Sequence, residues 1–473
     1  MENDAEKVMR EVFGFEAMRP HQANLIDAIL QGRDCLAVMP TGSGKSFCYA
    51  LPSIMRPGLT LVISPLIALI RDQLQRFQSL GISCASLDSL QTRDEKQQVW
   101  DAMQDGSLKL LFLSPERLCR VDFRQALRRL DVQMVAVDEA HCISHWGQNF
   151  RPEYRKIGEY LAEIGDVQKI ALTATATSEV RRDIVDSLRL EDPHEVWASF
   201  VRSNLQMKIL KTSKVSEQLQ TTLQAVLQSE GSGIVYVPTR KNAVEVERML
   251  LDAGVQARAY HAGLNGQRRM ATQDEFLSGK TRVVVATQAF GMGIHKADIR
   301  FVHHCGLPAN LEQYIQEAGR AGRDGLPAKC WLIYSLRDYH IRKYMLERSL
   351  PERAELAEVF EAASQMLVDG RGRSRQQLVH DLTTALAGDG RQIDSVVEIL
   401  AREGLIMRLT SLDAMREEQF VEGEMSAAEV ADYLDDVPRL RSDAFAKLDA
   451  LRSYVSLSGG QEQFLQDYFR PEL

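Results

Sequence analysis

The sequence of 473 residues has no long hydrophobic run, no low-complexity tract and no internal repeat. Its longest apolar stretch, residues 59–70, is interrupted by Ser64 and Pro65 and is shorter than the roughly 20 residues that a transmembrane helix needs. The N-terminal residues MENDAEKVMR are too acidic and polar for a signal peptide or a transit sequence. We therefore expect a cytoplasmic protein with no membrane association.

Cysteine is also scarce. The seven cysteines are odd in number and far apart, and no C-x-x-C pair or Cys/His spacing of a metal site occurs. Without such spacing the sequence predicts neither a disulfide framework nor a zinc site. We interpret the thiols as small core residues in a reducing compartment, and we expect no zinc.

An excess of basic residues is missing as well, since 57 Lys and Arg stand against 65 Asp and Glu. This balance excludes a protein that coats nucleic acid by bulk electrostatics, but it allows a local basic groove. Residues 409–436 contain nine acidic residues and one basic residue, so the rest of the chain is neutral overall. We expect this acidic segment to face solvent, a basic surface of the protein or a protein partner.

What the sequence does contain is two series of short apolar runs separated by helical patterns. The first series lies at residues 35–40, 59–65, 108–115, 134–140 and 169–177, and the second at 233–239, 257–263, 281–287, 299–305 and 328–334. Such runs are typical of parallel strands that are buried on both faces. They predict an α/β fold with two tandem parallel-sheet domains, 1–205 and 206–340, with ligands at the carboxyl ends of the strands.

The region 341–473 is mainly helical in pattern. Ser374 and Gln377 form a capping-box pattern before a helix that ends near Leu386, and residues 394–403 indicate a second helix before Gly404. A strand-like run, residues 405–410, follows. Helix, turn, helix and strand are typical of a winged-helix domain, and an unrelated small helical bundle is an equal alternative.

The string MPTGSGKS at residues 39–46 lies between the first strand and a helix, as a phosphate-binding loop does. Glycines let the backbone N–H groups wrap a phosphate, Lys45 can reach the β- and γ-phosphates, and the Ser46 hydroxyl can bind Mg²⁺. Met39 departs from the usual pattern, which has glycine there. The predicted nucleotide contacts of the loop are Thr41, Gly42, Ser43, Gly44, Lys45 and Ser46.

Two further strings complete a predicted ATPase site. Asp138 and Glu139 end an apolar strand, and we expect Asp138 to bind Mg²⁺ and Glu139 to be the general base that activates water. An acidic helix cap is the alternative. In QEAGRAGRDG, residues 316–325, Arg320 and Arg323 lie three residues apart and are expected to stabilise charge on the γ-phosphate.

Together these strings resemble superfamily 2 helicases, and specifically the RecQ family, over roughly residues 10–340. FGFEAMRPHQ (13–22) resembles the adenine-recognition motif, which implies that Phe15 stacks on the base while Arg19 and Gln22 bind its polar edge. SPLIALIRDQ (64–73) and SPERL (114–118) resemble motifs Ia and Ib, which touch the DNA backbone, here through Ser64 and Arg71. Strings that resemble motifs III, IV and V lie at residues 173–177, 234–243 and 283–302.

CISHWGQNFRPEY, residues 142–154, resembles the aromatic-rich loop with which RecQ enzymes sense single-stranded DNA. Trp146 and Phe150 offer ring faces for bases, and Arg151 adds a cation–π or phosphate contact. A packing role under the neighbouring strand is the alternative for these side chains. Gln148 stands where the family usually has a histidine, for which His145 is a candidate substitute, and His295 stands where motif V usually has asparagine.

The C-terminal region departs from the family pattern. Residues 437–469 resemble the helical hairpin of the RecQ zinc domain, but Gly460 occupies the place of the first zinc cysteine and no cysteine follows Cys330. We interpret residues 355–436 as a winged-helix-like insertion before a degenerate, zinc-free hairpin. We therefore expect this protein to lack the C-terminal helicase-associated domain of some relatives.

The resemblance implies an ATP- and Mg²⁺-dependent DNA helicase that moves 3′ to 5′ on single-stranded and partly duplex DNA, in DNA repair or recombination. The alternative is a DNA-stimulated ATPase, translocase or annealing factor with weak unwinding. A nucleotide-gated scaffold for a repair complex is the third hypothesis, which the intact ATPase residues argue against.

Overall fold

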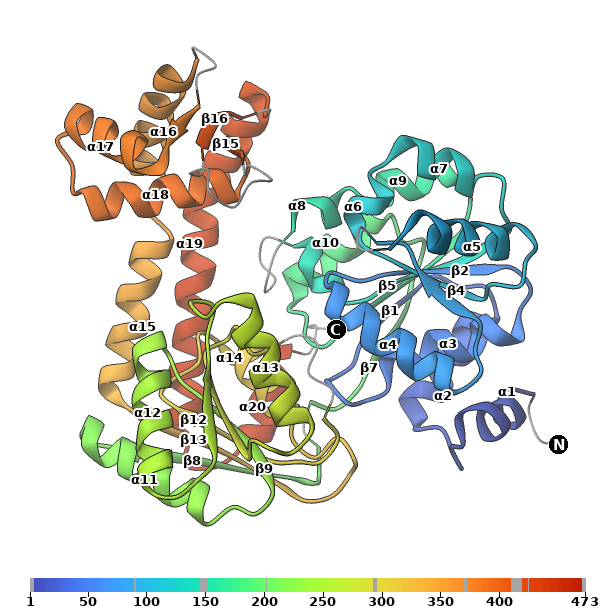
Figure 1. Ribbon diagram of the computed structural model, residues 1–473, viewed down its shortest axis with the longest axis horizontal. Helices are drawn as coiled ribbons and strands as arrows, with labels where there is room; N and C mark the ends of the chain where they lie inside the picture. The colour runs from blue at the N-terminus through green and yellow to red at the C-terminus, as the bar shows by residue number, and fades with distance from the viewer. Residues whose placement is uncertain are drawn as a thin grey trace. The chain divides into compact units, whose positions relative to one another are not determined.

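The computed structural model describes residues 4–88, 91–144, 151–200, 202–291, 296–368, 372–409, 419–423 and 425–469 (Figure 1). The chain divides into two compact units. The first comprises Met1–Ser335 together with Tyr454–Leu473, and the second comprises Leu336–Ser453.

The first sheet has seven parallel strands in the order β3-β4-β2-β5-β6-β1-β7. The five predicted strands are confirmed as β1 (Cys35–Val38), β2 (Leu59–Ile63), β4 (Leu110–Leu113), β5 (Val132–Val137) and β6 (Gln168–Thr173). The sequence did not predict β3 (Cys84–Ser86) and β7 (His194–Trp197), because these edge strands are short and only partly buried. The larger helices of this domain are α2 (Pro20–Leu30), α3 (Lys45–Met55), α4 (Ile67–Ser79), α5 (Arg93–Gln104), α9 (Ile157–Ile164) and α10 (Ser178–Leu188).

The second sheet has six parallel strands in the order β10-β11-β9-β12-β13-β8. Its predicted strands are β9 (Ser232–Tyr236), β10 (Ala257–Tyr260), β11 (Val283–Ala286), β12 (Ile299–Cys305) and β13 (Ala328–Ser335). The additional strand β8 (Leu205–Thr212) lies at an edge and is mostly half-exposed, which removes the apolar run that would identify it. The main helices are α11 (Val215–Leu227), α12 (Arg240–Asp252), α13 (Gly266–Leu277) and α14 (Leu311–Ala318). Two parallel-sheet α/β domains are thus confirmed.

The second unit contains a winged-helix arrangement. Its elements follow in the order α16 (Arg353–Leu367), β14 (Arg373–Ser374), α17 (Arg375–Leu386), α18 (Gly390–Arg402), β15 (Ile406–Leu409) and β16 (Gln419–Glu422). The strands form one antiparallel sheet, β14-β16-β15, and one apolar core unites the three helices with this sheet. This common core decides for the winged-helix interpretation over a simple bundle.

Of the two helix starts that the sequence predicts in this domain, one is confirmed and the other lies a few residues earlier. The Ser374 side chain accepts from the backbone of Gln377 and the Gln377 side chain accepts from the backbone of Ser374, so the predicted capping box is confirmed. The next helix begins at Gly390 rather than near residue 394, because the Asp389 side chain accepts from the Arg391 N–H at 3.0 Å and caps it there.

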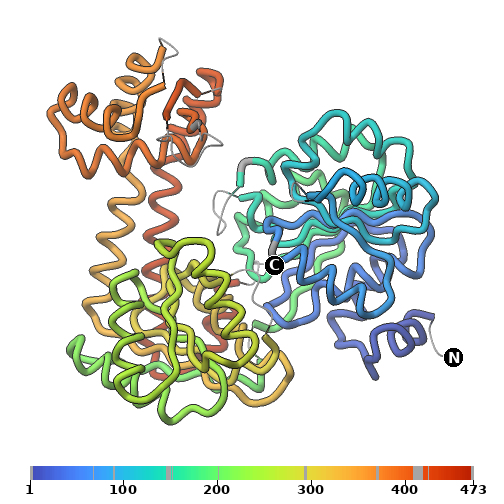
Figure 2. Tube along the Cα trace, in the orientation of Figure 1, coloured from blue at the N-terminus to red at the C-terminus, as the bar shows by residue number. Residues whose placement is uncertain are grey.

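Helix α19 (Ala427–Ser456) corrects the expected end of the insertion. Its 30 residues continue without interruption through Pro438, so a boundary at 436 falls inside one helix. Beside it runs α15 (Leu336–Ser349), as the chain trace in Figure 2 shows. The Tyr339 hydroxyl donates to Asp449 at 2.7 Å, and the Arg452 guanidinium lies 4.7 Å from the Tyr339 ring centre.

The end of α19 and the helix α20 (Gln461–Phe469) belong to the first unit. The Phe469 ring stacks on Phe200 at 4.3 Å, and the Tyr468 hydroxyl donates to Glu312 at 3.0 Å. The Tyr454 ring lies 5.9 Å from Tyr314. Aromatic packing therefore attaches this C-terminal hairpin to the linker between the sheet domains and to α14.

Phe469→Ala should release α20. Removing a buried aromatic ring costs about 3–5 kcal/mol of stability. A helix of about two turns is not stable in water without its packing contacts, so α20 should unfold. Hydrogen exchange of residues 461–469 should become fast, whereas Tyr468→Phe, which keeps the ring, should change it little. Because we expect no zinc, EDTA should leave exchange in the parent protein unchanged, and release of the hairpin by EDTA would contradict that expectation.

Candidate ATP site and nucleic-acid groove

The predicted phosphate-binding loop connects β1 to α3. Gly42 and Gly44 have φ angles of 82° and 87°, and a Cβ atom at Gly44 would collide with the Gln22 amide. Only glycine adopts this backbone and tolerates the close approach, so these positions allow the loop to wrap an anion. Met39 precedes the loop as an extension of β1, since its N–H donates to Thr173 O at 2.9 Å and its side chain is buried. The position at which the usual pattern has its first glycine is therefore part of the strand in this protein.

Gln22 joins the adenine-recognition motif to this loop. Its Oε1 accepts from the Arg19 N–H at 2.9 Å, and its Nε2 donates to Ser43 O at 2.8 Å. Arg19 Nη1 donates to Gly42 O at 3.2 Å. Both side chains thus contact loop carbonyls directly. The structure brings them to the loop, and their binding to the polar edge of adenine stays a prediction.

Phe15 is the adjacent aromatic residue. Its ring is 39% exposed and lies 5.4 Å from the Phe47 ring in an edge-to-face arrangement. Phe47 belongs to α3, two residues after Lys45. The exposed part of the Phe15 ring is available for a flat base.

Asp138 and Glu139 follow β5, next to the loop. Burial, and then the charge of Glu139, raises the pKa of Asp138 to about 6, and a cation bound beside this carboxylate would offset both effects. Burial opposes ionisation of Glu139, yet the charge of Lys45, followed by those of His141, Arg320 and Arg323, brings the pKa of Glu139 below its usual value. Glu139 therefore remains an ionised base.

The backbone of Glu139 is held in the left-handed region, at φ 50°. A non-glycine residue adopts this conformation at a cost, and such residues cluster at functional sites. Glu139 Oε2 is buried and accepts no hydrogen bond from the described residues. His141 Nδ1 lies 3.4 Å from this oxygen and 3.0 Å from Thr173 Oγ1. The Oε2 atom of Glu139 is thus available to accept a proton.

Arg320 and Arg323 follow α14 and lie near the same loop. Arg320 is buried and its charge acts on Glu139, as the pKa shift above shows. A Cβ atom at Gly42 would lie 3.4 Å from Arg323 Cγ, and one at Gly319 would lie 3.4 Å from Thr41 Cβ. Within the first unit, therefore, the two arginines, the loop and the acid pair form one site.

A groove of about 830 Å³ lies on the first sheet domain at the ends of the strings that resemble motifs Ia and Ib. Its side chains include four basic and two acidic residues. These are Lys96, Arg117, Arg120 and Arg151, with Asp88 and Glu116. An open, basic groove of this kind suits a nucleic-acid backbone.

Of the predicted DNA contacts that the structure describes, one lines this groove and two do not. Arg151 lines the groove, 3.6 Å from Glu116, while Arg71 is exposed on α4 and Ser64 is buried, so neither of the latter two lines the groove. Trp146 and Phe150 lie outside the described residues, as do His145, Gln148 and His295.

Comparison with known proteins identifies the family. The family described as DEAD/DEAH box helicase matches residues 19–183, and the helicase conserved C-terminal domain matches residues 214–325. The chain is 44% identical over 343 residues to the ATP-dependent DNA helicase RecQ of Pasteurella multocida, covering 72% of this chain and 54% of that protein. It is 36% identical over 356 residues to the probable ATP-dependent DNA helicase RecS of Bacillus subtilis, covering 75% of this chain and 71% of that protein. This chain belongs to the RecQ family of superfamily 2 helicases.

This RecQ-family chain spans a little over half the length of the RecQ proteins that it matches at 41–44% identity. Two solved structures share its fold. The DEAD-box helicase Mss116 has a TM-score of 0.57 at 16% identity and covers 85% of this chain and 89% of its own. The Mycobacterium smegmatis helicase Lhr has a TM-score of 0.54 at 20% identity and covers 88% of this chain and 60% of its own. They confirm the RecA-like character of the two sheet domains.

Arg202 and Asn204, which the sequence did not single out, form hydrogen bonds with the loop that carries Arg320 and Arg323. Arg202 Nη1 donates to the carbonyls of Gly319 and Ala321 at 3.2 and 3.1 Å, and its Nη2 donates to Gly322 O. Asn204 Nδ2 donates to Gly322 O at 2.9 Å and to Leu326 O at 2.8 Å. The linker before β8 thus positions the arginine loop of this RecQ-family protein.

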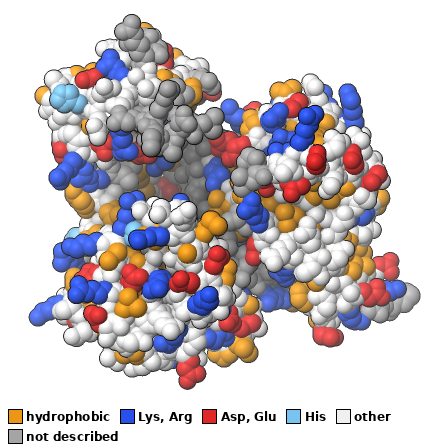
Figure 3. Space-filling view, viewed as in Figure 1, with side chains coloured by type: hydrophobic (Ala, Val, Ile, Leu, Met, Phe, Trp, Pro, Cys, Tyr) orange, Lys and Arg blue, Asp and Glu red, His pale blue; other side chains and the backbone are white. Residues whose placement is uncertain are grey.

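In the winged-helix domain, most of the described arginines around the helix-turn-helix form ion pairs with carboxylates. The pairs are Arg373 with Asp381, Arg375 with Asp394 and Glu398, Arg402 with Glu403, and Arg408 with Glu398. Arg391 is exposed, and Arg371 lies outside the described residues. Figure 3 shows basic and acidic side chains interspersed over the visible face of the molecule. Among its described residues, the winged-helix domain therefore offers a phosphate backbone few unpaired arginines around the helix-turn-helix.

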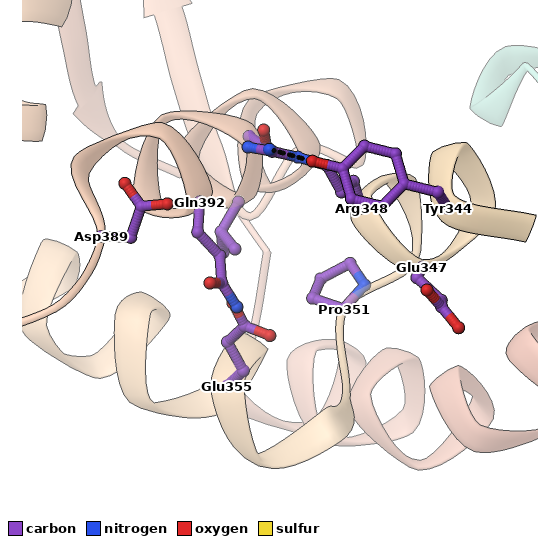
Figure 4. A pocket seen from close by; sticks show the side chains of 9 residues that line it. Tyr344, Glu347, Arg348, Pro351, Glu355, Asp389 and Gln392 are labelled. Carbon is purple, nitrogen blue, oxygen red and sulfur yellow. Dashed lines mark hydrogen bonds between the residues drawn. The ribbon is translucent and has the colours of Figure 1, made fainter. Parts of the chain in front are cut away.

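A cavity of about 310 Å³ in the second unit is lined by residues of α15, α16 and α18 (Figure 4). Its polar groups bond to one another: Arg348 Nη1 donates to the Tyr344 hydroxyl at 2.9 Å, and Gln392 Nε2 donates to Glu355 at 2.5 Å. Because these groups already have partners, we assign no ligand to it.

Two findings concern metals and membranes. Among the residues that the structure describes, no group of three or more His, Cys, Asp and Glu side chains is arranged to hold a metal ion. No helix in the described ranges is long and apolar enough to cross a membrane.

Proposed function

We propose that this chain is an ATP-dependent DNA helicase that couples hydrolysis of Mg²⁺-bound ATP to 3′-to-5′ movement along a single strand and to duplex unwinding, in DNA repair or recombination. The observation that carries the proposal is the meeting of the phosphate-binding loop, the acid pair and the two arginines within one compact unit. The names of the RecQ relatives support the substrate, and the 3′-to-5′ direction rests on the family resemblance.

In this proposal, Lys45 and the N–H groups of the loop bind the phosphates of ATP. The Ser46 hydroxyl and Asp138 would hold Mg²⁺, which supplies charge neutralisation at the β- and γ-phosphates. The residues fit such a cation, since Asp138 is a buried carboxylate beside a second carboxylate and its pKa is raised to about 6 without a cation. Phe15 stacks on the base.

Glu139 then accepts the proton of the water that attacks the γ-phosphorus. Arg320 and Arg323 stabilise the negative charge that develops on the equatorial oxygens. Because these arginines come from the second sheet domain, hydrolysis requires both domains at the nucleotide. Closure on ATP and reopening after hydrolysis would alternate the grip on a strand in the groove and give directed steps.

The second candidate is a DNA-stimulated ATPase, translocase or annealing factor with weak unwinding. The paired arginines of the winged-helix domain favour it, and so does Gln148 in place of the usual histidine. A strand-displacement assay with a 3′-tailed duplex, run beside an ATPase assay, separates the candidates. Displacement that requires ATP supports the helicase, and ATPase activity without displacement supports the second candidate. If both activities are absent, only the hypothesis of a binding scaffold is left.

Trp146→Ala tests whether the aromatic-rich loop senses DNA. If it does, DNA-stimulated ATPase should fall several-fold, because a stacking contact worth about 1–3 kcal/mol is lost, while the basal rate stays nearly unchanged. ATPase rates with and without a single-stranded oligonucleotide measure both quantities. An equal loss of both rates would instead assign Trp146 to packing. Gln148→His should alter the stimulation factor and leave folding intact.

The winged-helix domain should bind duplex DNA weakly, and its acidic segment should not touch it. We propose neutralising five acidic side chains together, namely Asp413, Glu417, Glu418, Glu422 and Glu424; of these only Glu422 lies within the described residues, where it is exposed. Duplex affinity and its salt slope should change little, because phosphate contacts come from basic groups. A large loss of affinity would show that this segment positions the DNA-binding surface.

A further inference from the structure

The Asp138 carboxylate is held by a side chain from another element. Its Oδ1 accepts from the Glu139 N–H at 3.0 Å, and its Oδ2 accepts from Gln73 Nε2 at 3.2 Å. Gln73 lies on α4 and is only 5% exposed. The sequence shows Gln73 simply as the last residue of the motif Ia string, with no indication that it reaches the acid pair.

Gln73 in turn contacts the helix of the phosphate-binding loop. Its Oε1 accepts from the Tyr49 hydroxyl, and Tyr49 is fully buried on α3, one turn after Lys45. Asp138 and the helix that follows the phosphate-binding loop are thus joined through Gln73 and Tyr49.

The chemistry of the three groups gives this chain of bonds one direction. An ionised carboxylate only accepts, so the Gln73 amide must present its NH₂ group to Asp138 and its oxygen to Tyr49. The Asp138 carboxylate is held in one orientation by these bonds, and its remaining lone pairs are kept available for a cation.

We propose that Gln73 and Tyr49 are positioning residues for Mg²⁺ binding: Gln73 orients the Asp138 carboxylate, and Tyr49 holds Gln73. This inference rests on the proposed function, since it concerns the metal ion of that ATP site. Partners that orient metal ligands typically contribute about 10–100-fold to metal affinity. Neither side chain touches the nucleotide in this role, because Gln73 acts through Asp138 and Tyr49 acts through Gln73.

The test is a Mg²⁺ titration of the binding of a fluorescent ADP analogue to the full chain. Gln73→Met preserves the length of the side chain and removes both hydrogen bonds. The Mg²⁺ concentration at the midpoint should rise about 10–100-fold, whereas affinity for the analogue in EDTA should remain that of the parent. Tyr49→Phe, which keeps the ring in the core, should raise the midpoint by a smaller factor. Gln75→Met, on the exposed side of the same helix, is the matched control and should change neither quantity.

A folded Gln73→Met protein with the parent's Mg²⁺ midpoint would overturn the inference, and so would an equal loss of affinity in EDTA, which would indicate general damage to the loop. If Gln73→Met does not fold, by its thermal melt, the Tyr49→Phe titration decides in the same way. Failure of the proposed function looks different, because the parent protein would then bind no nucleotide or show no effect of Mg²⁺.

Discussion

Glu139→Gln is expected to keep ATP bound while turnover falls by on the order of 10²–10⁴. The amide cannot accept the proton of the attacking water, but it has the size of the carboxylate and leaves Lys45, Ser46 and Asp138 in place. The left-handed backbone at Glu139 is unchanged by this substitution, so the site should keep its shape. ATPase rate and the affinity for a labelled ATP measure the two effects separately.

Two variants make this result specific. Glu159→Gln, at an exposed position on α9 of the same domain, should leave turnover at the parent value. Lys45→Ala should weaken nucleotide binding itself, because in the proposed site Lys45 contacts the phosphates in the ground state. Normal turnover in Glu139→Gln or in Lys45→Ala would remove the assignment of this loop and acid pair as the ATP site.

Arg320→Ala should lose about 10³–10⁵ in turnover, the contribution typical of an arginine that stabilises the transferred phosphoryl group. Arg320→Lys should recover little of it, because an ammonium lacks the planar fork of the guanidinium. ATP binding should change far less than turnover, since the proposal assigns ground-state binding to Lys45 and the loop. Single-turnover hydrolysis, beside a binding titration, measures the two.

Arg320 is buried, so loss of folding must be separated from loss of catalysis. A thermal melt of each variant makes that distinction, and Arg268→Ala, at an exposed position on α13, is the matched control. A folded Arg320→Ala protein that hydrolyses ATP at the parent rate would exclude a role at the γ-phosphate. Arg323 would then be the remaining candidate, to be tested in the same way.

Much of the ATP site could be predicted from neighbouring residues in the sequence. A phosphate-binding loop needs glycines at fixed places between a strand and a helix, and Gly42 and Gly44 have the left-handed backbone that this requires. The strands were recognisable wherever both faces are buried, as in β1 and β2, because burial demands an unbroken apolar run. The Ser374 cap was readable for the same reason, since all its contacts lie within one turn.

The sequence by itself thus determined the family, the two RecA-like sheets, and the loop, acid pair and arginines that the structure brings together. Tertiary structure decided the contacts between distant segments: Gln73 with Asp138, 65 residues apart, and Arg202 with the arginine loop, 117 to 120 residues apart. It also decided the carboxylate partners of the winged-helix arginines and the continuity of α19. The physical reason is that a polar side chain on an amphipathic helix leaves the same pattern whether it meets water or a buried carboxylate. Only the packing of the chain brings its partner within hydrogen-bond distance.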